Sequence, residues 1–497
     1  MRTIGRFYVL FFLAFNSGNA QTDNRIIEID QILEQLHLDQ RFNGNILIAE
    51  KGEILYERSF GHADFESDEK LSTTSLFNIA SVSKLFTVVG IMMLEEDKLL
   101  NIKDRAKLYF PDFPYDDITI EDLLAHTAGL PRIQSQPFRK EIEGKAYSNH
   151  EIKDVFFKIA PKQHFKAGTN YYYSNTSYML LALILEKVSK QSYNDFLVSR
   201  ILNKANMRQT FLREKRVPQS MQQYLVSYYH KPFWLSENFQ NVSHSERRIS
   251  DDLTFANDYG FSEIRTTTRD LLKFHTALQR GDLLTKAALE KMYAYHFLEH
   301  QKEYTVDAKS NYPSYRGLGW CVSKEDPNVV YHSGGSIGGR SFFIRNLEKN
   351  QCIIILTNNQ EMNRYNFTFP MKILNGAEYQ LDPISLPRDF CKIYLKNGIE
   401  EAVSFYQENN QNKRYTPFVD FDFEEIGAEM INKRDFKAAI EIYQLYVKAF
   451  SDEFSWELLG EAFLLDNNKS KAKSCFEKSL EFNPEYKSAL ESLAKIK

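Results

Sequence analysis

The stretch from Phe77 to Leu94 constrains the fold most, because it joins a long apolar run to two polar residues near its start. Apolar residues recur almost all round from Leu85 onward, which predicts a helix enclosed by the rest of the chain. The run is too short to span a bilayer. We therefore expect a central buried helix, with Ser81 and Lys84 on one face of its first turns.

Ser81 and Lys84 are three positions apart, a spacing that puts their Cβ atoms roughly 5–6 Å apart on a helix. Burial disfavours the charged form of a lysine, so Lys84 can serve as a base for the Ser81 hydroxyl. A helix-capping serine and a solvent-seeking lysine are the alternative. Three other serines share the spacing, but none opens a long apolar run: Ser67, Ser470 and Ser492.

The first twenty residues have the pattern of a secretory signal peptide, with two arginines, an apolar run from Phe7 to Phe15 and small residues ending at Ala20. We therefore expect an exported protein, periplasmic or secreted, without a membrane span. Losing Arg2 and Arg6 with this segment takes the formal net charge from −4 to −6. That charge argues against nucleic acid as a partner.

The cysteines are scattered without C-x-x-C or metal spacing, so no zinc site is indicated. We also expect that the protein needs no metal and no cofactor. The same scatter indicates no disulfide framework. A bridge between Cys321 and Cys352 stays open.

Strands are expected at both ends of the region before residue 387, with helices between them. An amphipathic helix from Ile26 to Leu38 precedes a hairpin, 44–50 and 54–58. Four late strands are expected at 317–322, 329–332, 341–345 and 352–356. This pattern predicts an α/β (α+β) sandwich, in which helices flank one mixed antiparallel sheet built from both ends of the region. The mostly helical middle would form a helical subdomain.

The last hundred residues repeat with an offset of 33. Gly427 recurs as Gly460, and Tyr443 recurs as Phe476. This resembles tetratricopeptide repeats, whose period is 34, followed by a capping helix. A plain helical bundle is the alternative, with almost the same structural consequences.

Four separated stretches extend the serine–lysine pair into a family pattern. They are Phe77 to Lys84, the run 124–131 around His126, the run 165–175 ending in Tyr173-Ser174-Asn175, and His332-Ser333-Gly334-Gly335. In this order they resemble the serine β-lactamase and penicillin-binding-protein superfamily, in particular its branch of class C β-lactamases, D-alanyl-D-alanine carboxypeptidases and esterases. The resemblance covers roughly residues 25 to 385.

The resemblance implies a serine hydrolase that acts through an acyl-enzyme on an ester, a D-amino-acid peptide or a β-lactam, in our order of preference. It makes Ser81 the nucleophile and Lys84 and Tyr173 the proton carriers, with the phenol pushed towards phenolate by the lysine ammonium. Asn175 is expected to hold Lys84 and the substrate amide. The substrate-binding strand would carry His332, Ser333, Gly334 and Gly335. The N–H groups of Ser81 and Gly335 would hold the oxyanion.

Three residues leave alternatives. Tyr147 also fits the tyrosine motif, but its stretch is charged, so we prefer Tyr173. His126 belongs to a motif of the family, yet we expect it to fix a loop by hydrogen bonds. His332 stands where many β-lactamases have lysine, and a mostly neutral imidazole attracts a substrate carboxylate less well. We therefore expect a preference for neutral substrates; an ordinary strand-end histidine is the alternative.

We divide the chain into a signal peptide (1–20), a β-lactamase-like hydrolase domain (21–387), a linker or degenerate helices (388–417) and tetratricopeptide-like repeats (418–497). The aromatic segment 222–239 is expected to be core of the helical subdomain, with a wall of the substrate pocket as the alternative. The repeats are expected to be dispensable for chemistry and to bind a protein partner or another copy of the chain. A sensor or binding protein is the alternative function, although the intact set of Ser81, Lys84 and Tyr173 argues against it.

Overall fold

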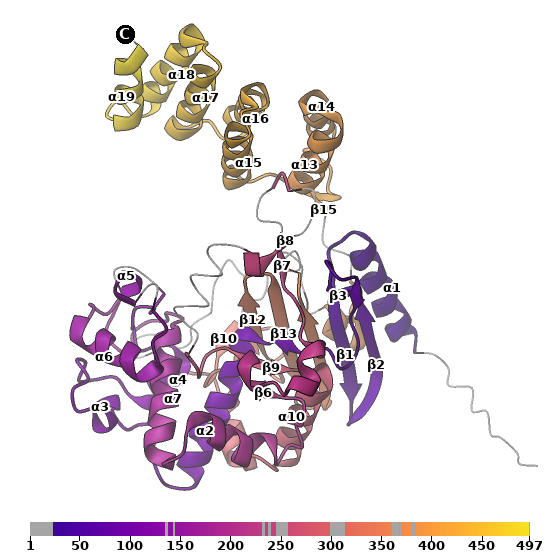
Figure 1. Cartoon of the computed structure of the whole chain (residues 1–497), viewed down its shortest axis with the longest axis vertical. Coiled ribbons are helices and arrows are strands. Elements are labelled where there is room, and N and C mark those ends of the chain that lie inside the picture. Colours follow the sequence, from indigo (N-terminus) through magenta and orange to yellow (C-terminus); the bar gives the residue numbers. More distant parts are fainter. Residues whose placement is uncertain are drawn as a thin grey trace, which may run out of the picture.

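The computed structural model describes residues 23–134, 138–142, 145–230, 234–236, 240–244, 257–298, 314–359, 367, 369–379 and 384–496. The predicted signal peptide lies outside these residues. Figure 1 shows a sheet with surrounding helices, and a stack of helices from residue 386 onward at one end of the molecule. In the described part of the chain, no helix has both the length and the apolar character needed to cross a membrane.

A seven-stranded antiparallel sheet is the centre of the larger body, in the order β10-β11-β12-β13-β14-β1-β2. β1 (Gly44–Glu50) pairs along its whole length with β14 (Gln351–Thr357), so both ends of this region meet in one sheet, as predicted. The hairpin of β1 with β2 (Glu53–Phe60) is also confirmed. The late strands are β10 (Ser314–Arg316), β11 (Cys321–Ser323), β12 (Val329–Ser336) and β13 (Gly339–Asn346).

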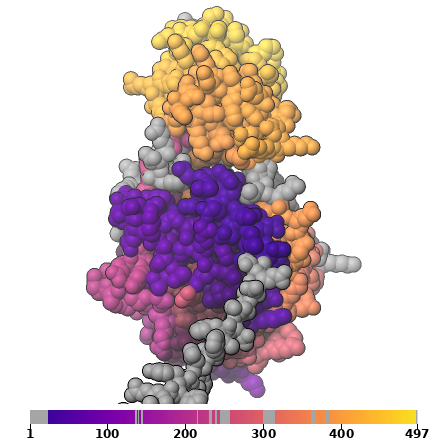
Figure 2. Space-filling model, turned by 90° about the vertical axis from the view of Figure 1, so that its right-hand side faces the viewer, coloured from indigo at the N-terminus to yellow at the C-terminus, as the bar shows by residue number. Residues whose placement is uncertain are grey.

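The sheet is covered on both faces, which explains why β14 is apolar from Cys352 to Leu356 rather than alternating. Its Ile353 and Ile355 pack against α1 (Asn24–Leu38) and α12 (Phe369–Leu374). Its Ile354 and Leu356 point to the other face, into the large core that holds α2 (Lys84–Glu96) and α10 (Thr268–Arg280). Figure 2 shows the side of the N-terminal segments, in indigo, below the orange and yellow C-terminal helices.

The remaining elements of this body are short strands and the helices of the middle of the chain. The helices are α3 (Ala106–Tyr109), α4 (Ile120–Ala125), α5 (Phe138–Ile142), α6 (Asn149–Ile159), α7 (Asn175–Ser189), α8 (Tyr193–Phe196) and α11 (Lys286–Tyr293). The short strands are β3 (His62–Asp64), β4 (Glu69–Lys70), β5 (Phe77–Asn78), β6 (Phe211–Leu212), β7 (Tyr229–His230), β8 (Gln240–Asn241) and β9 (Ile264–Thr266). α7 packs on α2 and α4, which places the tyrosine motif beside the Ser81 region.

The run from Phe77 to Leu94 is not one helix, contrary to our expectation. β5 pairs with β9, the stretch Ala80–Ser83 forms a 3₁₀ turn, and the α-helix begins only at Lys84. Ala80 has a φ of 45°, a left-handed conformation that a continuous right-handed helix does not allow. The apolar run predicts the buried helix correctly from Lys84 onward.

The four cysteines are free thiols. Cys321 lies on β11 and Cys352 on β14, and two strands separate these in the sheet. Adjacent strands are already about 4.8 Å apart, so the distance excludes the bridge that the sequence left open.

The C-terminal helices are arranged as consecutive pairs. They are α13 (Leu386–Asn397) with α14 (Ile399–Asn409), α15 (Asp420–Asn432) with α16 (Phe436–Ala449), α17 (Glu453–Leu465) with α18 (Lys469–Phe482), and a last helix α19 (Lys487–Ile496). A short parallel ladder of β15 (Ile384–Ser385) with β16 (Tyr415–Thr416) closes the first pair. The stretch 388–417, expected as a linker or degenerate helices, holds most of the pair α13 and α14, which shares one buried cluster with the later helices.

The 33-residue offset has a physical basis in this stack. A Cβ at Gly427 would lie 2.3 Å from the ring of Tyr443, and a Cβ at Gly460 would lie 2.6 Å from the ring of Phe476. In both pairs an aromatic ring of the second helix rests on the glycine of the first. The two units therefore repeat the same close contact; their assignment to the tetratricopeptide type stays a prediction.

Candidate active site

Ser81 and Lys84 meet, but from two adjoining elements rather than from one helix. Ser81 is half-buried in the 3₁₀ turn, and Lys84 is the first residue of α2 and fully buried. Lys84 Nζ donates hydrogen bonds to Ser81 Oγ at 3.1 Å and to the backbone oxygen of Phe261 at 3.0 Å. The hydroxyl of Ser81 is thus within direct proton-transfer distance of the amine.

Burial lowers the pKa of Lys84 well below the ordinary lysine value, and the nearby positive charge of Arg316 lowers it further. Three aromatic rings surround the amine, those of Tyr173, Tyr178 and Phe261, with centroids 4.9 to 5.5 Å from Nζ. The site therefore favours a neutral amine, which is the form a general base needs.

Tyr173 is the tyrosine that faces Lys84. Burial raises the pKa of the Tyr173 phenol, and a hydrogen bond with Ser81 offsets only part of that effect. The structure therefore reverses our expectation of a phenolate, because both members of the pair favour their neutral forms. Tyr147 lies elsewhere, at 6.0 Å from Lys145, and its motif partner Asn149 binds the backbone of Tyr259.

The turn that carries Ser81 is held by side chains from two directions. Asn78 Oδ1 accepts a hydrogen bond from the backbone N–H of Ala80 at 2.8 Å. From β13, Ser341 Oγ donates to the backbone oxygen of Ile79 at 2.7 Å. These contacts keep Ala80 in its left-handed conformation and so fix where Ser81 stands.

β12 passes directly beside this turn. A Cβ at Gly334 would lie 2.3 Å from the Ile79 backbone oxygen and 3.0 Å from the Ser81 nitrogen. Gly334, which we expected on the substrate-binding strand, is thus required by the close approach of the protein's own turn. Ser333 and Gly335 lie on the exposed side of the strand. Gly335 is opposite Arg340, whose guanidinium nitrogen would be 3.1 Å from a Cβ there.

His332 is buried on β12, with Nδ1 2.7 Å from the backbone oxygen of Ser333. This contact places the proton on Nδ1, since the oxygen can only accept. Burial, together with the charge of Arg316, lowers the pKa of His332 well below its usual range. His332 is therefore a neutral imidazole, and its Nε2 has no hydrogen-bond partner among the described residues.

Asn175 is the first residue of α7 and is half-buried. Its Oδ1 is enclosed and has no hydrogen-bond partner within the described ranges. The hydrogen bonds of Lys84 go to Ser81 and Phe261 instead, so the structure does not show Asn175 holding the lysine. Its expected contact with a substrate amide stays a prediction.

His126 has the geometry of the loop-fixing role that we expected. It closes α4 in a left-handed conformation, with φ 60°, and its Nδ1 accepts the backbone N–H of Ser174 at 3.2 Å. Its ring packs on Tyr173, with centroids 4.4 Å apart. His126 therefore supports the tyrosine motif from behind.

Arg316 is the residue of the site that sequence reasoning missed. It lies on β10, is 5% exposed, and donates to the hydroxyl of Tyr171 at 2.8 Å. Its charge lowers the pKa of Lys84, His126 and His332. A single arginine outside every motif gives no signal in the sequence, yet it supplies the permanent cation that His332 does not. An exposed second arginine, Arg132, donates to the Tyr173 backbone oxygen at 2.7 Å.

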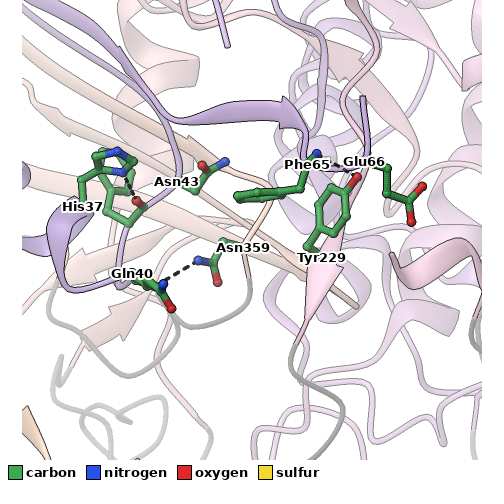
Figure 3. Close-up of a pocket in the computed structure, with 8 residues that line it drawn as sticks. His37, Gln40, Asn43, Phe65, Glu66, Tyr229 and Asn359 are labelled. Carbon is green, nitrogen blue, oxygen red and sulfur yellow. Dashed lines mark hydrogen bonds between the residues drawn. The ribbon is translucent and has the colours of Figure 1, made fainter. Parts of the chain in front are cut away.

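A separate pocket of about 370 Å³ lies where the end of α1 meets the start of β1 and the β7 strand (Figure 3). It is lined by His37, Gln40, Phe42, Asn43, Phe65, Glu66, Tyr229 and Asn359. None of these residues belongs to the Ser81 site. Among the residues that the structure describes, no group of three or more His, Cys, Asp or Glu side chains is placed to hold a metal ion.

Comparison with known proteins agrees with this geometry. The family model described as Beta-lactamase matches residues 29–377. Penicillin-binding protein 4* of Bacillus subtilis (strain 168) is 32% identical over 377 residues, which cover 73% of this chain and 78% of that protein.

Two solved structures share the fold at low identity. The octameric penicillin-binding protein homologue from Pyrococcus abyssi superposes with a TM-score of 0.60 at 18% identity, over 76% of this chain and 81% of that one. EstCE1, a hydrolase with promiscuous acyltransferase activity, gives a TM-score of 0.58 at 20% identity, over 71% of this chain and 98% of that one.

Proposed function

Because the chain belongs to the β-lactamase family of serine hydrolases, we propose that it is an exported hydrolase that forms an acyl-enzyme on Ser81. The observation that carries this proposal is the hydrogen bond of 3.1 Å between Lys84 and Ser81 in an enclosed site that lowers the pKa of Lys84. A sensor without catalysis would gain nothing from a buried lysine of this kind, because burying it costs folding free energy.

The proposed reaction has two half-reactions. In the first, neutral Lys84 takes the proton of Ser81 Oγ while that oxygen attacks the substrate carbonyl carbon. The backbone N–H groups of Ser81 and Gly335 hold the oxyanion. The protonated phenol of Tyr173 then gives its proton to the leaving group, and Lys84 returns a proton to the phenolate. In the second half-reaction, the same groups activate water against the ester formed on Ser81.

Two substrate classes remain in this proposal. A neutral ester suits the neutral imidazole of His332, as the sequence suggests. A D-amino-acid peptide or a β-lactam carries a carboxylate, and the permanent charge of Arg316 behind the site, with Arg132 at its rim, favours such a substrate. Because the charge of Arg316 favours the carboxylated substrates, we keep them as candidates beside the neutral esters. A partner for the C-terminal helices, either another protein or another copy of the chain, is part of the same proposal.

Labelling tests the proposal directly. Wild-type protein is treated with a fluorophosphonate and with a labelled penicillin, and peptide mass spectrometry locates the adduct. We expect an adduct on the peptide that contains Ser81, lost in Ser81→Ala and kept in the matched control Ser67→Ala. Labelling that persists in Ser81→Ala contradicts the assignment. Turnover of esters but not of penicillin would select the first substrate class.

A further inference from the structure

One segment of the hydrolase body leaves it and enters the C-terminal helices. Trp234 and Leu235 lie between β7 and β8, yet they are 6% and 3% exposed and belong to the same buried cluster as α13 and α15. Figure 1 shows β7 and β8 at the edge of the hydrolase body that faces those helices. The aromatic segment 222–239 is thus divided, and Trp234 packs in neither of the places we expected; Phe233 lies outside the described residues.

Trp234 is held on α15 by hydrogen bonds with two glutamates. Its indole Nε1 donates to Glu425 at 2.8 Å. The Glu429 carboxylate accepts two adjacent backbone N–H groups, from Trp234 at 2.6 Å and from Leu235 at 2.8 Å. Two N–H groups on one carboxylate satisfy backbone donors that burial would otherwise leave unpaired.

Two cations complete the contact. Lys433 Nζ donates to the backbone oxygen of Leu235 at 3.2 Å. The guanidinium of Arg388, on α13, lies 4.6 Å from the centre of the Trp234 ring. A buried aromatic anchor with polar contacts around it is the usual form of an energetic hot spot in an interface.

The other end of the hairpin touches the active site. Tyr228 accepts a hydrogen bond at its hydroxyl from the backbone N–H of Asn78 at 2.5 Å. Its ring lies on Gly339, where a Cβ would be 2.6 Å from Cε1, and Val242 packs in the same way on Gly338. Gly338 lies in the turn between β12 and β13, and Gly339 is the first residue of β13, so the hairpin covers the end of the substrate-binding strand.

Asn78 connects this hairpin to the nucleophile. The backbone N–H of Asn78 donates to the Tyr228 hydroxyl, and the side chain of Asn78 accepts the N–H of Ala80. Ala80 directly precedes Ser81. A path of two hydrogen bonds therefore runs from the hairpin to the Ser81 turn.

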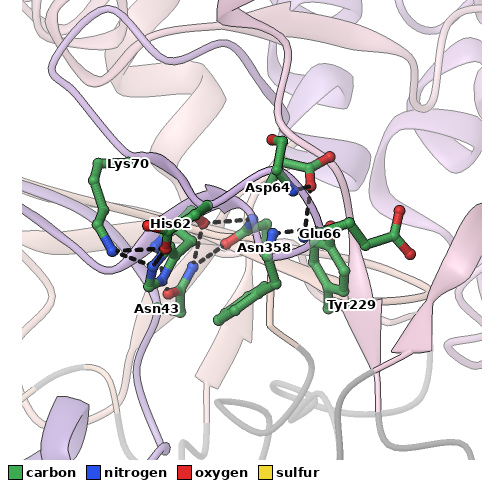
Figure 4. Close-up of polar contacts among 10 residues, drawn as sticks. Asn43, His62, Asp64, Glu66, Lys70, Tyr229 and Asn358 are labelled. Carbon is green, nitrogen blue, oxygen red and sulfur yellow. Dashed lines mark hydrogen bonds and ion pairs between the residues drawn. The ribbon is translucent and has the colours of Figure 1, made fainter.

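Within the described residues of the hydrolase body, hydrogen bonds of Asn358 tie the hairpin at its root. Asn358 Nδ2 donates to the backbone oxygens of His62, Ala63 and Ser227, and Asn43 donates to Asn358 (Figure 4). Beyond the root, the ladder of β7 with β8 has only two residues in each strand. A two-stranded ladder of this length is marginal by itself, so its order depends on what holds its tip.

We propose that Trp234 is a positioning residue, and that its docking on α13 and α15 holds the Tyr228 hairpin against the Ser81 turn and the β12–β13 turn. The C-terminal helices thereby contribute to catalysis, against the expectation that they are dispensable. This inference rests on the proposed hydrolase function. It assigns the surface of α13 and α15 that contacts Trp234 an occupant from the same chain.

The test uses the full chain with Trp234→Ala and, as a matched control, Trp456→Ala. Trp456 is a half-buried indole on α17 that binds Ser451 and takes no part in the contact. We expect Trp234→Ala to lower kcat on a small activated ester by roughly 10-fold to 100-fold with little change in KM, because a misplaced nucleophile slows the chemical step. Trp456→Ala should keep kcat; an equal loss in both variants overturns the inference.

A double-variant cycle separates positioning from general damage. Tyr228→Phe removes the acceptor of the Asn78 N–H, so it breaks the same path at its other end. The double variant Trp234→Ala/Tyr228→Phe should therefore be no slower than the slower single variant. Full additivity of the two losses contradicts a shared path.

Hydrogen–deuterium exchange provides a readout that does not depend on activity. In Trp234→Ala we expect faster exchange in the peptide that spans Asn78 to Lys84, and no change there in Trp456→Ala. Unchanged exchange at that peptide overturns the inference even if the protein proves to be a hydrolase. Faster exchange in a chain that never labels Ser81 supports the coupling and rejects the proposed function instead.

Discussion

Lys84 Nζ lies 4.9 Å from the centre of the Tyr173 ring, with the burial of both groups disfavouring their charged forms. The protonation state that suits catalysis is therefore a neutral Lys84 amine beside a protonated Tyr173 phenol. This arrangement is available only between the pKa of Lys84 and the pKa of Tyr173, which sets the pH range of activity.

The first prediction concerns that range. As pH rises, kcat/KM on a neutral ester should increase while Lys84 loses its proton, with a midpoint below the ordinary lysine pKa of about 10.4. It should fall again only above the ordinary range of tyrosine, because burial raises the pKa of Tyr173. Arg316→Gln should move the acid limb to higher pH, since the charge of Arg316 lowers the pKa of Lys84. Arg316→Lys keeps the charge and should leave that limb nearly unmoved; equal shifts in both variants would contradict this cause.

The second prediction decides between the two tyrosine motifs. Tyr173→Phe removes the phenol that faces Lys84 and should lower kcat by roughly 10²-fold to 10⁴-fold. Tyr147→Phe is the matched control, because Tyr147 lies beside Lys145 and takes no part in the site. Steady-state kinetics on one ester compares them. Similar losses in the two variants would mean that the proton relay has been assigned to the wrong group.

The sequence predicted the parts of the fold that depend on local chemistry. The hairpin of β1 with β2 follows from its turn residues, and β14 is recognisable from its apolar run. The start of the central helix was wrong, because Ala80 owes its left-handed conformation to contacts with Asn78 and to the neighbouring β13 strand. The contact with Asn78 is local, but the contact of Ser341 with Ile79 joins segments far apart in the chain, and no local pattern encodes it.

The same limit applies to the site. Ser81, Lys84 and Tyr173 come together as their motifs suggest, whereas Arg316 comes from β10, outside every motif, and acts on Lys84 through its charge. Trp234 resembled core because tryptophan is apolar, and the partners that bind it, Glu425 and Glu429, lie almost two hundred positions later in the chain. Neither the position of Arg316 near the site nor the contact of Trp234 with the two glutamates follows from a periodic pattern in the sequence.

The third prediction is a gain in stability when catalysis is removed. Between the lowered pKa of folded Lys84 and its ordinary unfolded value, the unfolded chain binds more protons, so stability rises with pH there and Lys84 is destabilising at lower pH. Lys84→Met should therefore raise Tm at pH 7 while abolishing activity, and the gain should shrink as pH approaches 10. Thermal unfolding measures both effects. Lys158→Met on the exposed side of α6 is the control, with no gain expected; a lower Tm for Lys84→Met at pH 7 would contradict the argument.

The last prediction concerns the charge of the substrate. If the buried charge of Arg316 binds a carboxylate, Arg316→Gln should lower kcat/KM for an anionic substrate by roughly 10-fold or more relative to a neutral ester of similar size. Arg132→Gln, which removes an exposed charge at the rim, should change the same ratio much less, because water screens it.

His332→Lys supplies the complementary test, because a lysine there restores the charge that the neutral imidazole lacks. It should raise the preference for the anionic substrate, and it should do so more strongly when Arg316 has been replaced by glutamine. The measurement is the ratio of kcat/KM for the two substrates in each variant. A ratio that stays constant across all of them would show that neither Arg316 nor position 332 senses substrate charge, and would leave a neutral ester as the substrate class that fits this site.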